Sequence, residues 1–140
     1  MLDVGSCGSE VGRTKLCVAK TCMDTLKVLL LDDEPLIINL LMRILSKDPR
    51  YEVDSATRGY DAINLAVANS YGAMICDIQL PDLDGPDVVK EMRQRRCGPK
   101  MVIFISGAVK AAPRNEGSDT FFIRKPFNSS EILTLLNRCR

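Results

Sequence analysis

Short runs of consecutive apolar residues recur along the chain, separated by stretches in which apolar residues are spaced three and four apart. The runs at 27–31, 73–76, 101–105 and 120–123 do not alternate with polar residues, which is typical of strands buried on both faces of a parallel sheet. A weaker strand is predicted at 51–56. The pattern therefore predicts a sheet of five strands.

Apolar residues at helical spacing predict helices between these strands. Pro35 suits the first turn of the first helix, and Asn128 with Glu131 forms a capping box at the start of the last. The residues expected to face the core are Leu36, Ile37, Leu40, Leu41, Ile44 and Leu45 in the first helix, Ala62, Ile63, Ala66 and Val67 in the second, Val88, Val89 and Met92 in the third, and Ile132, Leu133 and Leu136 in the last.

The alternation of strands and helices, βαβαβαβαβα, predicts an α/β fold with a doubly wound parallel sheet and helices on both faces. In one of the two common strand orders of such sheets, 2-1-3-4-5, the first and third strands are neighbours and ligands bind beyond their carboxyl ends. Pro113 would break a helix between the last two strands, so we predict a short or frayed fourth helix at 108–118. Residues 1–22 lack steady periodicity, so we expect a disordered extension before a domain at 23–140.

The composition is that of one soluble globular domain. The chain has 140 residues, of which 46% are hydrophobic and 26% charged. The net charge of +1 predicts no direct binding to nucleic acid or to an anionic membrane. No apolar run approaches the roughly 20 residues of a membrane-spanning helix, and the start of the chain does not read as a signal peptide. We therefore expect a cytoplasmic protein.

The chain contains six cysteines and no histidine. A disulfide framework is one interpretation, but the α/β pattern predicts a core that is stable without disulfides. No C-x-x-C pair is present, which together with the lack of histidine argues against a zinc site. We therefore expect free thiols in a reducing compartment and no zinc site. The absence of histidine excludes Ser-His-Asp and Cys-His catalysis within the chain, and also a histidine kinase that acts on itself.

Polar residues that could bind a metal or take part in catalysis follow four of the predicted strands. Asp32 and Asp33 come directly after the first strand, Asp77 after the third, Ser106 after the fourth and Lys125 after the fifth. Three converging carboxylates repel one another unless a cation lies among them, and an oxygen-only ligand set suits Mg²⁺. A metal, a carboxylate nucleophile, a lysine and a hydroxyl are what phosphoryl transfer to a carboxylate requires.

Each of these residues also has a purely structural interpretation. The Asp-Asp pair could cap a helix, Asp77 and Ser106 could belong to turns, and Lys125 could be a solvated loop residue. Four independent turns do not explain why all four positions fall at the same edge of one sheet. The joint pattern therefore favours a functional site.

The motifs LLLDDEP around Asp32 and Asp33, ICDIQLPDLDG around Asp77, FISG around Ser106 and FFIRKPF around Lys125 resemble those of the receiver domain of two-component response regulators. The resemblance covers about residues 26–138. It implies the flavodoxin-like fold with strand order 2-1-3-4-5 and a phosphoacceptor signalling switch. By this resemblance Asp77 is the residue that receives the phosphoryl group.

The resemblance also implies the ligands of Mg²⁺ and the residues of the switch. Asp33 and Asp77 are expected to bind the metal directly, Asp32 through water, and Gln79 through its backbone carbonyl. Lys125 is expected to pair with the phosphoryl group, Ser106 to move toward it, and Phe122 to occupy the position of an aromatic rotamer switch. Phe122 lacks a hydroxyl, so switching there would act through packing alone.

A chain without histidine needs a histidine kinase or a phosphotransfer protein in trans as its phosphodonor. We expect output through a downstream protein partner, and no enzymatic activity beyond the chain's own phosphorylation and dephosphorylation. Three alternatives stay open: a receiver module excised from a hybrid kinase or multidomain regulator, a Mg²⁺-dependent phosphohydrolase with an aspartyl-phosphate intermediate, and a degenerate receiver that serves as a scaffold. Gln79 argues against the phosphohydrolase, because such an enzyme would usually place a second carboxylate there.

Overall fold

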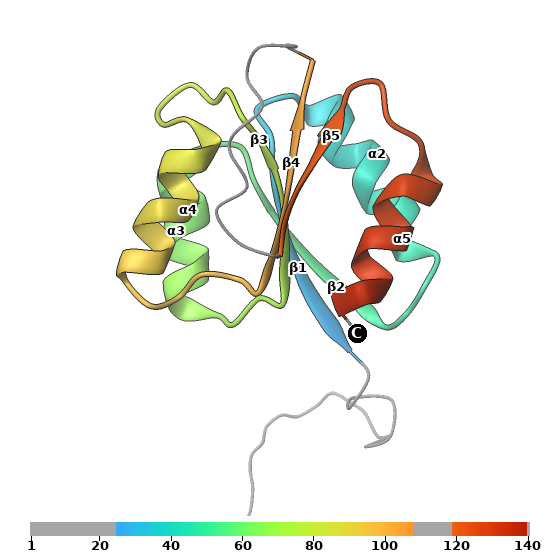
Figure 1. Ribbon diagram of the computed structural model, residues 1–140, viewed down its shortest axis with the longest axis horizontal. Coiled ribbons are helices and arrows are strands. Elements are labelled where there is room, and N and C mark those ends of the chain that lie inside the picture. The colour runs from blue at the N-terminus through green and yellow to red at the C-terminus, as the bar shows by residue number, and fades with distance from the viewer. Residues whose placement is uncertain (1–24, 108–118, 140) are drawn as a thin grey trace, which may run out of the picture.

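The computed structural model describes residues 25–107 and 119–139. In this part of the chain, five strands and four helices follow one another (Figure 1). The elements are β1 (Leu26–Leu31), α2 (Pro35–Ser46), β2 (Tyr51–Ala56), α3 (Gly59–Ala68), β3 (Ala73–Asp77), α4 (Gly85–Gln94), β4 (Met101–Ser106), β5 (Thr120–Arg124) and α5 (Ser129–Cys139). All five predicted strands are present.

The strands form one parallel sheet in the order β2-β1-β3-β4-β5, which confirms the predicted strand order. Figure 1 shows α2 and α5 on one face of the sheet and α3 and α4 on the other. The register pairs Leu31 of β1 with Cys76 of β3, and Asp77 of β3 with Ile105 of β4. The carboxyl ends of the three central strands therefore finish side by side.

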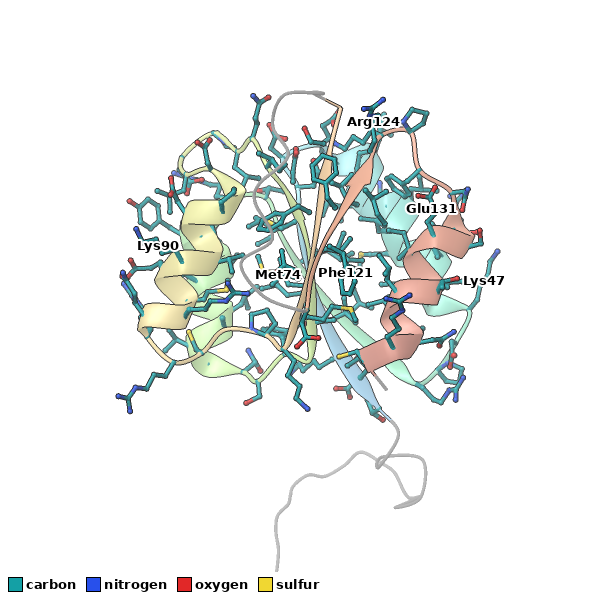
Figure 2. The ribbon with its side chains drawn as sticks, viewed as in Figure 1. Lys47, Met74, Lys90, Phe121, Arg124 and Glu131 are labelled. Atoms are coloured by element: carbon teal, nitrogen blue, oxygen red, sulfur yellow. The ribbon has the colours of Figure 1, made fainter. Side chains whose placement is uncertain are left out.

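Successive residues of each strand enter opposite halves of the core. Val28 and Leu30 of β1 pack with α2 and α5, whereas Leu29 and Leu31 pack with α3 and α4. Figure 2 shows the same division further along the sheet, where Met74 points toward the α3 and α4 side and Phe121 toward the α2 and α5 side. Helices cover both faces, which explains why β1, β3 and β4, the strands inside the sheet, appear in the sequence as unbroken apolar runs.

The structure corrects several details of the prediction. Leu36, Leu40 and Val67 were expected to face the core, but they are 81%, 42% and 58% exposed. Asp77 and Ser106 are the last residues of β3 and β4, not the residues that follow them. The apolar run ends one residue before each strand does, because Asp77 and Ser106 are polar and still pair with the neighbouring strand.

Some predictions fall on residues outside the described ranges. These are the extension at 1–22, the start of the predicted domain at 23, and the short or frayed helix at 108–118. Among the described residues, the three cysteines Cys76, Cys97 and Cys139 carry free thiols. Within the same residues, no helix combines the length and the apolar character needed to cross a membrane.

Candidate functional site

The carboxyl edge of the sheet brings together the polar residues that follow or end its strands. Asp32 and Asp33 follow β1, Asp77 ends β3, Ser106 ends β4, and Lys125 follows β5. An open hollow at this edge is lined by Asp33, Glu34, Asp77, Gln79, Leu80, Pro81, Ser106, Gly107 and Lys125. The parallel ladder places these side chains together although they come from distant parts of the sequence.

Three carboxylates converge at this edge of the sheet, two of them lining the hollow. One carboxylate oxygen from each of Asp32, Asp33 and Asp77 lies within 4.8 Å of the other two. Asp32 and Asp77 are only 2% and 8% exposed, while Asp33 is exposed to solvent. Burial, together with the charge of Asp32, raises the pKa of Asp77 from 3.8 to about 6. Burial also raises the pKa of Asp32, in part against the hydrogen bond from the Glu34 backbone N–H.

This cluster fits a divalent metal site. A concentration of negative charge with two buried members is unfavourable without a cation. The ligand atoms are all oxygens, and the exposed Asp33 leaves the site open to water. Hard oxygen ligands and retained waters are what Mg²⁺ prefers.

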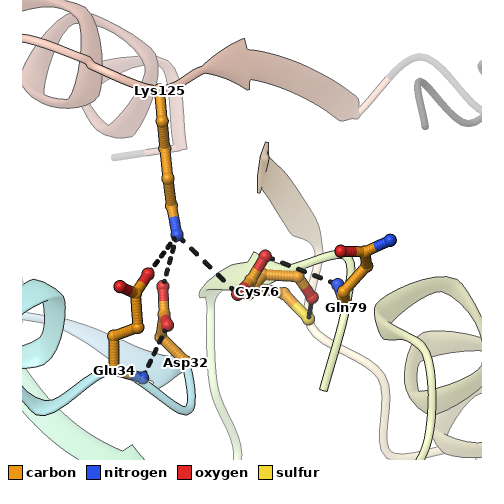
Figure 3. Close-up of polar contacts among 6 residues, drawn as sticks. Asp32, Glu34, Cys76, Gln79 and Lys125 are labelled. Carbon is orange, nitrogen blue, oxygen red and sulfur yellow. Dashed lines mark hydrogen bonds and ion pairs between the residues drawn. The ribbon is translucent and has the colours of Figure 1, made fainter. Parts of the chain in front are cut away.

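Lys125 extends from the end of β5 across the hollow toward the acidic residues (Figure 3). Its Nζ lies 3.3 Å from Asp32 Oδ2, 3.7 Å from Asp77 Oδ2 and 3.1 Å from Glu34 Oε1. Burial alone would lower the pKa of Lys125, but the hydrogen bond to Glu34 and the charges of Asp32 and Asp77 raise it. The lysine therefore stays protonated and offsets one of the negative charges around it.

Glu34 belongs to the site although the sequence analysis assigned it no role. It directly follows the acidic pair and precedes Pro35, the first residue of α2. Its carboxylate is largely exposed and accepts a hydrogen bond from Lys125 Nζ. The third acidic letter of the motif DDEP was the only sequence signal for it, because the partner lysine lies 91 positions further along the chain.

The phosphoacceptor candidate Asp77 is held from several sides. Its Oδ1 accepts a hydrogen bond from the Gln79 backbone N–H at 3.4 Å, and its backbone carbonyl accepts one from the Cys76 thiol at 3.2 Å (Figure 3). Burial raises the pKa of the Cys76 thiol well above its usual range, with the charges of Asp77 and Asp32 acting in the same direction. The thiol is therefore neutral and adds no further negative charge beneath the site.

The remaining predicted residues differ in how close they lie to the acidic cluster. Ser106 is buried at the end of β4 and lines the hollow together with Gly107. Its backbone carbonyl accepts a hydrogen bond from the Lys125 N–H at 2.9 Å, which joins the ends of β4 and β5. Phe122 is half-buried on β5 and packs against the core beneath α3 and α4, and it does not line the hollow. Gln79 lines the hollow from the loop after β3.

Comparison with known proteins identifies the family of this arrangement. The sequence model of the response regulator receiver domain matches residues 28–137, which is most of the chain. The chain belongs to the response regulator receiver domain family. This receiver domain is therefore a signalling module of the two-component type, as the motifs predicted.

Relatives of this receiver domain include whole regulators and single domains. It is 30% identical over 110 residues to the transcriptional regulatory protein SrrA of Staphylococcus aureus, covering 76% of this chain and 44% of that protein. The chain thus spans less than half the length of this relative. Chemotaxis protein CheY4 of Vibrio cholerae matches with a TM-score of 0.73 and 26% identity, over 83% of this chain and 99% of that one.

A third relative was solved as a complex. Response regulator protein TrrA of Thermotoga maritima, in complex with Mg²⁺ and BeF, matches this receiver domain with a TM-score of 0.72 and 25% identity. The match covers 83% of this chain and all of that chain, 100%.

Proposed function

We propose that this receiver domain is a phosphoacceptor switch in which Asp77 takes a phosphoryl group from a phosphohistidine in a Mg²⁺-dependent reaction. The observation that carries the proposal is the meeting of three carboxylates and one lysine at the carboxyl edge of the sheet. The Mg²⁺ and BeF complex of TrrA supports the same chemistry for a relative of this fold.

In this proposal Asp33 and Asp77 bind Mg²⁺ directly, Asp32 acts through water, and the backbone carbonyl of Gln79 is a further ligand. The cluster supports it, since its three oxygens lie within 4.8 Å of one another. When bound, the metal neutralises charge that develops on the transferring phosphoryl oxygens. Asp32 is the most buried of the three carboxylates, which suits a residue that orients water from behind the site.

The chemical step forms one bond and breaks one. A carboxylate oxygen of Asp77 attacks phosphorus, and the bond between phosphorus and the donor's imidazole nitrogen breaks, with its electron pair leaving on the imidazole. Lys125 Nζ, 3.7 Å from Asp77 Oδ2, is placed to pair with an oxygen of the incoming group. Ser106 and Phe122 are proposed to carry the change outward, Ser106 through its hydroxyl and Phe122 through packing. A new charge of about −2 biases the domain toward the form that a partner recognises.

The phosphodonor is a histidine kinase or phosphotransfer protein, because this chain contains no histidine. The output partner is a protein that contacts the phosphorylated form. Relatives include the receiver domain of the hybrid histidine kinase CckA, so a place within a longer signalling protein is compatible with the same chemistry. A phosphohydrolase is less well supported, because Gln79 stands two residues after Asp77, where a second acid/base carboxylate would be needed.

Replacement of the acceptor tests the proposal. Asp77→Asn should abolish labelling by acetyl phosphate in the presence of Mg²⁺, as measured by the intact mass of the protein. Asp87→Asn is the matched control, since Asp87 is an exposed carboxylate in the first turn of α4, and it should label like the wild type. A chelator should abolish labelling of both the wild type and the control. Equal labelling of Asp77→Asn and wild type would reject the assignment.

A further inference from the structure

The loop between β3 and α4 carries Gln79, and its base is fixed beneath Asp77. The Gly85 backbone N–H donates to the Ile78 carbonyl at 2.6 Å, which closes the loop into a ring. A side chain at Gly85 would collide with the Asp77 backbone carbonyl, so only glycine allows this close approach. Residues 79–84 thus project from a narrow base at the edge of the site.

The outer end of the same loop is held by Asp82. Asp82 Oδ1 accepts a hydrogen bond from the Gly59 backbone N–H at 2.8 Å, and Oδ2 accepts one from the Tyr60 N–H at 3.0 Å. Gly59 and Tyr60 are the first two residues of α3, whose own N-cap residue, Arg58, makes no side-chain capping bond. Asp82 therefore supplies, from a distant loop, the carboxylate that a helix N-terminus favours.

The fit between this loop and α3 is close. A Cβ atom on Gly59 would lie 2.7 Å from Val88 Cγ2 and 3.3 Å from Asp82 Oδ1, so a side chain there would push the loop and α4 away. Burial alone would raise the pKa of Asp82, but the amide donors of Tyr60 and Gly59 bring it below its usual value. The carboxylate is thus ionised and fully engaged with the helix at neutral pH.

We propose that Asp82 is a positioning residue for the metal site, because it anchors the loop that carries Gln79 to the N-terminus of α3. Without this anchor the loop would keep the bond from Gly85 to Ile78 at its base and the packing of Leu80 and Leu83 against the core, but it would lose its hydrogen bonds to α3. A loosened loop would present the Gln79 carbonyl less often in the place where Mg²⁺ needs it. The inference rests on the proposed function, since it takes Gln79 as a metal ligand.

Two substitutions at Asp82 and one control separate this role from others. Asp82→Ala removes both acceptors, and its Kd for Mg²⁺ should rise on the order of tenfold, the size of effect typical when a residue that supports a metal ligand is lost. Asp82→Asn keeps one oxygen acceptor and should give a Kd between those of Asp82→Ala and wild type. Asp87→Ala, which removes an exposed carboxylate from α4, should leave the Kd unchanged.

The measurements are Mg²⁺ titration by calorimetry, the rate of labelling by acetyl phosphate, and amide hydrogen exchange in the metal-free protein. Exchange at Gly59 and Tyr60 should be faster in Asp82→Ala than in wild type, because these N–H groups lose their acceptors. The labelling rate of Asp82→Ala should approach that of wild type at saturating Mg²⁺, since the acceptor and Lys125 are untouched. A defect that is overcome by Mg²⁺ distinguishes positioning of a ligand from damage to the reacting groups.

The outcomes are distinguishable from failure of the proposed function. If wild type neither binds Mg²⁺ nor labels, the proposed function fails whatever Asp82 does. If wild type does both and folded Asp82→Ala binds Mg²⁺ equally well, Asp82 only caps α3 and the inference is overturned. Should Asp82→Ala fail to fold, Asp82→Asn decides: a Kd equal to that of wild type would overturn the inference, and a weaker one would support it.

Discussion

Asp77 combines two properties that oppose each other in the metal-free protein. It must be ionised to attack phosphorus, yet it is 8% exposed and lies beside Asp32. The pKa of Asp77 is raised to about 6, so the folded state binds its proton more tightly than the unfolded state, where the pKa is near 3.8. The ionised Asp77 therefore destabilises the folded state at neutral pH, although its charge is needed at the site.

The sign of this cost gives a prediction at the level of one residue. In metal-free protein, stability should rise as pH falls from above 6 toward 4, because the folded state gains the proton first. Asp77→Asn should remove most of this dependence of the free energy of unfolding on pH. It should also stabilise the protein at neutral pH by about 1 to 3 kcal/mol, because a pKa raised from 3.8 to about 6 corresponds to about 3 kcal/mol at most. Urea unfolding of both proteins with a chelator present, at several pH values, measures it. An Asn variant less stable than wild type at neutral pH would contradict the prediction.

The elements are where sequence reasoning succeeded most and where its limits are clearest. Unbroken apolar runs located the strands because both faces of the sheet are covered, and the site residues followed because each lies at the end of such a run. Glu34 and Asp82 received no role, because their partners lie 91 and 22 or more positions away and no periodicity connects them. Leu36 was predicted to face the core because it fits the apolar spacing of the first helix. This spacing alone does not show which apolar residue at the edge of the buried face stays exposed to solvent.

The capping box of α5 is an element-level feature that the sequence predicted and the structure contains. Asn128 Oδ1 accepts a hydrogen bond from the Glu131 N–H at 2.9 Å, and Glu131 Oε1 accepts one from the Asn128 N–H at 3.4 Å. The hydroxyl of Ser130 also donates to Asn128 Oδ1, at 2.6 Å. This side chain therefore satisfies more than one donor at the start of α5.

Replacement of this cap should lower stability by a predictable amount. Asn128→Ala should reduce the free energy of unfolding by about 1 kcal/mol, because helix N–H groups lose their acceptor. Asn137→Ala, at an exposed position in the last turn of α5, is the matched control and should be close to neutral. Urea denaturation should show a lower midpoint for Asn128→Ala with an unchanged slope. Equal midpoints for the two variants would show that the cap contributes nothing.

At the scale of the whole molecule, the strand order brings the residues of the site together. The order β2-β1-β3-β4-β5 makes β1 and β3 neighbours at the centre of the sheet, with helices leaving their ends toward opposite faces. Ligands of such sheets bind at this reversal, beyond the carboxyl ends of the strands. The acidic residues from the two strands meet only when the full sheet has formed. Metal binding should therefore report on folding of the entire domain.

This coupling predicts that Mg²⁺ stabilises the protein as a whole. An ion that binds only the folded state adds about 2.7 kcal/mol at a concentration one hundred times its Kd. The melting temperature of wild type should therefore rise with Mg²⁺ but not with NaCl of equal ionic strength. The gain should shrink as pH falls through about 6, because protonation of Asp77 then competes with the metal.

Single replacements assign this stabilisation to its ligands. Asp33→Asn should lose more of the gain than Asp32→Asn, because Asp33 is exposed at the mouth of the hollow and is proposed to touch the ion, whereas Asp32 lies behind it. Each variant serves as the charge-matched control of the other, since both remove one carboxylate from the same cluster. A larger loss for Asp32→Asn would reverse the ligand assignment. An equal rise in melting temperature with NaCl would show that the acidic edge responds to ionic strength and holds no specific metal.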